Sequence, residues 1–156
     1  MAKHVQQQVI EALAAALGVG SGIGAASVFV DRVDPLPVSR LPAFIVEESE
    51  RGETVELETL EGTEQRTLEV RVSCLVAGGD DYGQRARALG LQAERALSGT
   101  ASGAEPLYEL CAGGVQLMAS AIALSGEGRD AVAVRTQLWH CIYSINPDRP
   151  DVALSF

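Results

Sequence analysis

The strictest constraint on the fold of this chain is the alternation of side chains in residues 66–78, RTLEVRVSCLVAG. Successive side chains of a β-strand point to opposite faces of a sheet, so every second residue shares a face. One face of this segment is apolar and is formed by Leu68, Val70, Val72, Cys74 and Val76. The other face is polar and is formed by Thr67, Glu69, Arg71 and Ser73. The segment is therefore expected to be a half-buried strand of an antiparallel sheet.

The rest of the chain supplies partners for this strand. Helical spacing of apolar residues predicts helices over residues 4–17 and 80–97, and Gly18 favours the end of the first one. Further strands are expected over residues 27–33, 43–50, 54–60, 115–124 and 131–145. Because most of these strands follow one another through short turns, the sequence predicts an α+β fold: a mostly antiparallel sheet with two α-helices packed on one face.

Residues 43–60 are expected to form an extended acidic β-hairpin. A turn around Gly52 would join residues 43–50 to residues 54–60. At 156 residues the chain is expected to hold a single domain over residues 1–146. Residues 147–156 contain two prolines and are expected to be a C-terminal tail that is extended or loosely ordered until it meets a partner.

Acidic side chains are concentrated in this hairpin. Eight glutamates lie between Glu47 and Glu64, in a chain of net charge −9. Three interpretations are open: charges that prevent edge-to-edge aggregation, an acidic surface that serves an assembly or lines a channel, and a carboxylate pair for catalysis or metal binding. From charge alone, we expect the segment to face a lumen or a neighbouring subunit through Glu47, Glu48, Glu50, Arg51, Glu53, Glu56 and Glu58.

Other patterns that could carry chemistry are weak. Residues 20–25, GSGIGA, fit the loose dinucleotide fingerprint G-x-G-x-x-A, but here a helix precedes the glycines and a strand follows them. The fingerprint requires the reverse order, so we expect a flexible joint. His140 alternates to the face opposite Cys141, which leaves no nucleophile with a base beside it on that strand. We therefore expect no enzymatic activity, no cofactor and no bound metal.

The cysteines and the charge limit the environment of the protein. Cys74, Cys111 and Cys141 are widely spaced and lack a C-x-x-C motif, so we expect buried free thiols in a reducing cytoplasm. A strongly acidic chain is not expected to bind nucleic acid by releasing counterions from phosphates. No signal peptide and no membrane-spanning run is recognised.

The order of the patterns resembles the tail terminator proteins of long-tailed bacteriophages, the family of the lambda-like tail terminator. The resemblance covers about residues 3–146. It is carried in sequence by HVQQQVIEALAAAL, LPAFIVEESERGE, RTLEVRVSCLVAG, DYGQRARALGLQAERAL and VQLMASAIALSGEGRDAVAVRTQLWHCIYSIN.

The resemblance implies an α+β subunit that forms a hexameric ring on the last ring of tail tube protein. Such a ring ends tube growth, offers a surface to the head–tail connector protein and leaves a pore through which DNA passes without specific binding. It would lie at the head-proximal end of the virion tail after assembly in the host cytoplasm. The alternatives are a neck or tail-completion protein, a small-ligand-binding enzyme and a cytoplasmic binding module.

Overall fold

The protein is described here by a computed structural model that covers residues 2–57, 62–126 and 131–155. In chain order the elements are α1 (Val5–Gly20), β1 (Val28–Val30), β2 (Ala43–Leu57), β3 (Glu64–Ala77), α2 (Tyr82–Ala96), α3 (Glu105–Leu110), β4 (Gly114–Ser125), β5 (Val132–Asn146) and β6 (Arg149–Leu154). The predicted α+β class is confirmed, and α3 adds a short third helix.

The strands form one sheet in the order β1-β2-β3-β5-β4, with β6 added beside β5. All the pairs are antiparallel except β1 and β2, which run parallel. The parallel pair differs from the pairing expected for consecutive strands. The proline-containing connection over residues 31–42 is long enough to carry the chain back before β2 begins, so no tight turn joins the two strands.

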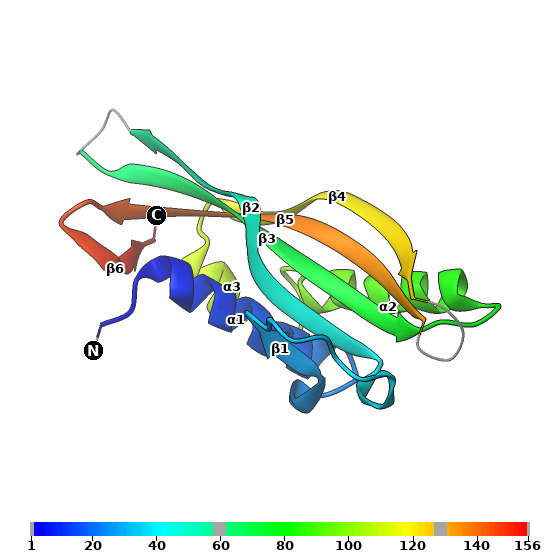
Figure 1. Cartoon of the computed structure of the whole chain (residues 1–156). Coiled ribbons are helices and arrows are strands. Elements are labelled where there is room, and N and C mark those ends of the chain that lie inside the picture. The colour runs from blue at the N-terminus through cyan, green and yellow to red at the C-terminus, as the bar shows by residue number, and fades with distance from the viewer. Residues whose placement is uncertain (1, 58–61, 127–130, 156) are drawn as a thin grey trace.

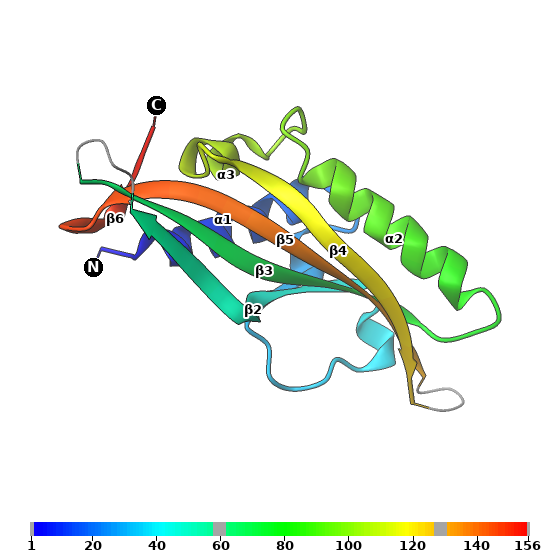
Figure 2. The same cartoon turned by 90° about the horizontal axis from the view of Figure 1, so that it is seen from above.

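The helices lie on one side of the sheet, and its other face carries no helix among the residues shown (Figures 1 and 2). The apolar face predicted for residues 66–78 points toward the helices, and Leu68, Val70, Val72 and Cys74 are fully buried. From β5, the Trp139 face is buried while the His140 face is not. The two predicted helices therefore cover one face of the sheet, as expected.

Close contact between α1 and α2 explains why the first helix extends past its predicted end. The helix continues through Gly18 to Gly20 and is capped at Ser21, where the backbone N–H bonds to the Leu17 carbonyl. A Cβ atom at Gly20 would lie 2.9 Å from the Cα of Ala96 in α2. The glycine stretch therefore allows the helices to approach before the chain turns, at Gly22 and Gly24, through positive φ angles of 85° and 87°.

A buried amide connects the sheet to α2. The side chain of Gln137 in β5 donates from Nε2 to the Gly90 carbonyl at 3.1 Å and accepts from the Trp139 indole N–H at 3.1 Å. Gln137 is only 1% exposed, and both of its polar ends are paired. The hydrogen bonds fix the position of α2 over β5, because an unpaired amide at this depth would be costly.

The sequence prediction of a turn at Gly52 is wrong. The chain does not turn at Gly52: β2 is continuous from Ala43 to Leu57, and Gly52 lies in a bulge between Glu48 and Glu53. A glycine in a polar segment is compatible with either a turn or a bulge, and pairing with β3 on both sides selects the bulge. The C-terminal segment takes the extended form of the two that were expected, and its strand β6 pairs with the end of β5.

Candidate functional site

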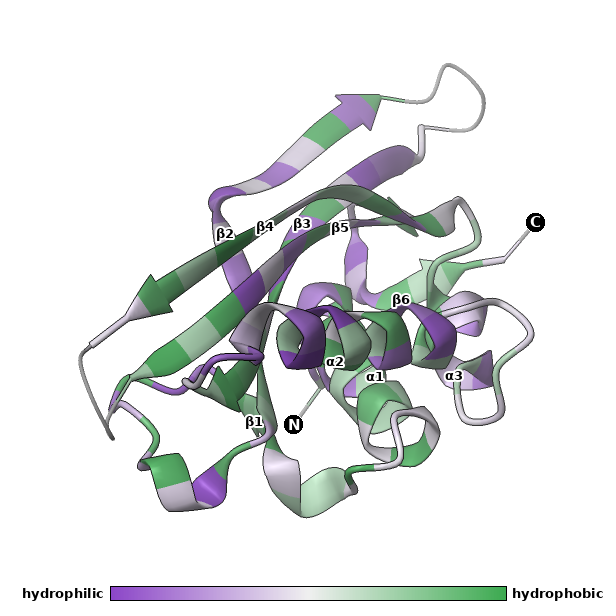
Figure 3. Cartoon of the chain, turned by 90° about the vertical axis from the view of Figure 1, so that its right-hand side faces the viewer, coloured by the Kyte–Doolittle hydropathy of each residue, from purple (hydrophilic) through white to green (hydrophobic). Residues whose placement is uncertain are grey.

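The bulge in β2 reverses which side chains face the helices. Residues 49–52 together oppose a single residue of β3. Before the bulge, Phe44 and Val46 point into the core. After it, Glu53 lies opposite the core residue Leu68 and so shares its face. We call Glu53–Leu57 and Glu64–Leu68 the distal hairpin; it extends beyond the helix layer (Figures 1 and 3).

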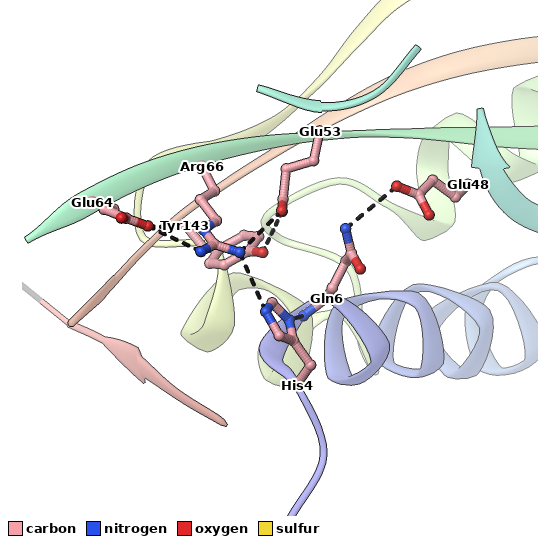
Figure 4. Close-up of polar contacts among 7 residues, drawn as sticks. All are labelled: His4, Gln6, Glu48, Glu53, Glu64, Arg66 and Tyr143. Carbon is pink, nitrogen blue, oxygen red and sulfur yellow. Dashed lines mark hydrogen bonds and ion pairs between the residues drawn. The ribbon is translucent and has the colours of Figure 1, made fainter. Parts of the chain in front are cut away.

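Ionic and polar side chains hold the helix side of the distal hairpin together (Figure 4). The Arg66 guanidinium contacts Glu64 Oε2 at 3.0 Å and Glu53 Oε2 at 3.3 Å. The phenol of Tyr143 donates a hydrogen bond to Glu53 Oε1. These side chains are mostly shielded, with Arg66 20% and Glu53 10% exposed. Arg66, Glu53, Glu64 and Tyr143 form what we call the arginine cluster.

The environment of this cluster shifts the pKa values of two of its members. Burial and the hydrogen bond to ionised Glu53 both raise the pKa of the Tyr143 phenol above its ordinary value. Partial burial lowers the pKa of Arg66, but the hydrogen bond to Glu64 and the charge of Glu53 outweigh it, so the net shift is upward. The cluster therefore contains a neutral phenol and a permanent cation between two carboxylates.

The start of α1 meets the arginine cluster. The Gln6 backbone N–H donates to His4 Nδ1 at 3.0 Å, which caps the helix, and Arg66 Nη1 lies 3.2 Å from His4 Nε2. A neutral imidazole has one acceptor nitrogen, so only one of these contacts is a hydrogen bond at a time. The Gln6 side chain reaches Glu48 Oε1 at 3.3 Å. The N-terminal turn of α1 thus contacts β2 before the bulge, through Glu48, and the β3 strand of the distal hairpin, through Arg66.

A second polar group lies inside the bulge, on the face away from the helices. The Ser49 hydroxyl donates to Glu69 Oε1 at 2.5 Å, and His140 Nε2 lies 3.0 Å from Glu69 Oε2. Glu69 is only 6% exposed. The Ser49 hydrogen bond, followed by the His140 contact, lowers the pKa of Glu69 although burial opposes the shift. A shallow hollow beside it is lined partly by Arg51 and Arg71.

The arrangement of Ser49, Glu69 and His140 does not suit nucleophilic catalysis. The carboxylate lies between the hydroxyl and the imidazole, whereas an activated serine requires a base that contacts its hydroxyl and a third group that orients that base. A carboxylate whose pKa is lowered is also a weak base. The contacts of Glu69 instead fasten the bulge to β3 and β5.

The structure describes six of the seven predicted site residues, and these six fall into two groups. Three of them contact the body of the protein: Glu47 pairs with Arg71 at 3.0 Å, Glu48 accepts from Gln6, and Glu53 joins the arginine cluster. Three others have exposed side chains, namely Glu50, Arg51 and Glu56. The seventh, Glu58, lies outside the described residues. Within the described part of the segment, the acids available to a partner are Glu50 and Glu56, with Glu48 partly engaged.

Sequence reasoning missed the residues that organise the segment: Ser49, Arg66, Glu69, His140 and Tyr143. The sequence places Glu69 on the polar face of its strand and His140 on the face opposite Cys141. Only the register between β3 and β5 shows that they are opposite each other. The register depends on turns and packing that the sequence does not specify.

The remaining candidates for chemistry are not arranged for it. Among the residues described, no group of three or more His, Cys, Asp or Glu is placed to hold a metal ion. Cys74, Cys111 and Cys141 are free and buried, as predicted. Burial raises the pKa of Cys74 to about 12, which keeps its thiol protonated and unreactive. No helix in the described part of the chain is both long and apolar enough to span a membrane.

Comparisons with known proteins give little beyond this geometry. No family model matches the chain, and no curated protein matches it either. Among solved structures, the chain is similar to a chain of the "Virion of native gene transfer agent (GTA) particle", with a TM-score of 0.36 and 19% sequence identity over 89% of this chain and 91% of that one. At this TM-score and identity, the likeness transfers no role to the present chain.

Proposed function

We propose that this chain is a structural virion subunit that caps a bacteriophage tail tube as a ring. The ring would be a hexamer that ends tube polymerisation, contacts the tail tube protein on one side and the head–tail connector on the other, and leaves a passage for DNA. The proposal starts from the order of helices and strands, which resembles that of tail terminators.

The observation that carries the proposal is the distal hairpin. It projects beyond the helix layer, and the pairing of its β3 strand with β5, the arginine cluster and the contact with α1 hold it in a fixed direction (Figure 4). Two exposed acids, Glu50 in the bulge and Glu56 in the distal hairpin, have no ion pair among the described residues. A rigid arm with free acidic side chains suits either an assembly contact or the wall of a passage that must not bind DNA.

The test adds the purified chain to polymerising tail tubes and measures their length by electron microscopy. The wild-type chain is expected to stop growth and to form a ring at one tube end. Glu50→Arg and Glu56→Arg are expected to weaken capping or to slow DNA passage. Glu109→Arg, at an exposed position on α3, changes the net charge equally and serves as the control.

Two outcomes would contradict the proposal. Tubes that grow normally in the presence of the chain exclude a terminator. Binding to the connector without binding to tubes favours the alternative of a neck or tail-completion protein. Normal capping and DNA passage by both arginine variants would leave the terminator role intact and remove the acidic hairpin from it.

A further inference from the structure

The two borders of the sheet are built differently. At one border, β2 carries Glu50, Glu53 and Glu56, is interrupted by the bulge, and is partly covered by β1. Charges, bulges and short covering strands are the devices by which proteins prevent an edge strand from pairing with another chain. This border is therefore protected against pairing with the same border of a second copy, which would bring like charges together.

The opposite border, formed by β4, has almost none of this protection. The sequence of Gly114–Ser125, GVQLMASAIALS, contains no charged residue and no proline. Among the described strands, β4 pairs only with β5, so its outer backbone groups have no strand partner. One irregularity occurs near Met118, and the pairing with β5 is regular from Ala119 to Ser125. Most of these side chains are exposed, Met118 by 53% and Leu124 by 48%.

Arginines lie next to this neutral edge. The Arg135 guanidinium reaches from β5 to Ser120 of β4 and donates to its hydroxyl at 2.8 Å. The Arg135 side chain also packs near Gly90 of α2, where a Cβ would lie 3.4 Å from Arg135 Cγ. Arg87 lies one helical turn before Gly90 on the same side of α2 and is exposed. Glu94, one turn beyond Gly90, offsets part of this charge.

We propose that the β4 edge of one copy pairs with the outer edge of the distal hairpin of a second copy, Glu53–Leu57 of β2. Those β2 residues lie beyond the part of the strand that β1 covers, so their outer edge is also without a strand partner among the residues shown. The uncharged β4 brings no like charge to the acidic strand. Arg87 and Arg135 would face Glu50 and Glu56, which supplies charge complementarity between the two borders.

The contact joins different surfaces of the two copies, so each bound copy still offers one free border. Contacts of this kind produce a ring when the rotation between copies closes, and an open chain when it does not. The expectation of a closed ring rests on the proposed function, whereas the strand contact stands on the two borders alone. The same arrangement assigns the exposed acids a neighbour within the assembly.

The first experiment measures self-association of the full chain by sedimentation up to millimolar concentration, with hydrogen exchange on the separated species. Association is expected, with new protection of backbone amides in both Gly114–Ser125 and Glu53–Leu57. Ala121→Lys, at an exposed position of β4, is expected to weaken association by about tenfold, as for the loss of one interface contact. Ala15→Lys, at an exposed position of α1, is the matched control.

A charge exchange separates this contact from general destabilisation. Arg87→Glu and Glu56→Arg are each expected to weaken association, and the two changes combined in one chain are expected to restore part of it. A merely structural effect would not be rescued by the second change. A chain that stays monomeric, an association without new protection in β4, or a closed dimer protected in β4 alone would each overturn the proposal.

The outcome is distinguishable from that of the proposed function. If copies associate through these borders but do not cap tail tubes, the strand contact stands and the terminator role fails. If Ala121→Lys caps tubes as well as the wild-type chain does, the terminator role stands and the strand contact fails.

Discussion

The paired strands β2 and β3 have two halves, one near the helices and one in the distal hairpin, and different interactions stabilise them. The half near the helices is fixed by side chains that water does not reach, such as Phe44, Val46 and Val72. In the distal hairpin Leu68 is buried, but Val55 and Leu57 are 50% and 78% exposed. Its direction is set by the pairing of β3 with β5, together with the arginine cluster and the contact with His4. Buried hydrophobic residues therefore stabilise the half near the helices, whereas charged residues help to position the distal hairpin.

The strongest test of this comparison is truncation in the buried half. Phe44→Ala removes a fully buried ring and is expected to lower the free energy of unfolding by about 3–5 kcal/mol, through lost burial and a cavity. Urea unfolding followed by circular dichroism measures the change. Val55→Ala in the distal hairpin is the control, with an expected loss within about 0.5 kcal/mol. Equal losses at the two positions would contradict the division.

The second test removes the cation of the distal half. Arg66→Met keeps an apolar stem but leaves the shielded Glu53 carboxylate without its ion pair, so the free energy of unfolding is expected to fall by about 1–3 kcal/mol. In the double variant with Glu53→Gln, part of the loss should disappear, because the unpaired charge is gone. An additive double variant would show that the two side chains act independently.

The third test acts on the bulge that separates the halves. Gly52 has a φ angle of +66°, so Gly52→Ala is expected to cost about 1–2 kcal/mol of stability, because a Cβ is disfavoured there. Asparagine tolerates this conformation better, so Gly52→Asn should cost less than Gly52→Ala. Thermal unfolding of the two variants side by side measures the difference. If Gly52→Asn instead lost more stability than Gly52→Ala, the loss would follow side-chain size and would indicate crowding near Glu48.

The smallest expected effect is on pH dependence. The pKa of Glu69 is lowered in the folded chain, chiefly by Ser49 and then by His140, with a further contribution from the charge of Arg51. A lowered carboxyl pKa stabilises the fold above the ordinary value of 4.5, and this stability is lost as the pH falls through the folded pKa. Wild type should therefore lose more stability on acidification than Glu69→Gln, as measured by urea unfolding. Equal slopes would remove Glu69 from the acid response.

The helices and strands can be predicted from the sequence because the spacing of apolar residues shows which side of each element is buried. The alternation in residues 66–78 identifies the core face of β3, and the helical spacing of residues 80–97 identifies the buried side of α2. Features that depend on contacts between elements far apart in the sequence are harder to predict. The first helix continues past Gly18 because Gly20 can lie against Ala96, a contact that no local pattern encodes.

The candidate site is harder to predict than the fold because it depends on strand register. The acids of residues 47–58 are visible as a cluster, but their division into fixed and exposed side chains is not. That division follows from the bulge, which turns Glu53 toward Arg66 and leaves Glu56 exposed. A single glycine in a polar segment does not distinguish a bulge from a turn.

The hydrogen-bonded pair of Gln137 and Trp139 has a practical consequence. Trp139 is the single tryptophan of the chain and is 4% exposed, so the ultraviolet emission of the protein comes largely from one ring between the sheet and α2. Separation of these layers would admit water to the indole and move its emission to longer wavelength. The chain therefore carries an intrinsic optical reporter of its own core, and unfolding can be followed without attaching a dye.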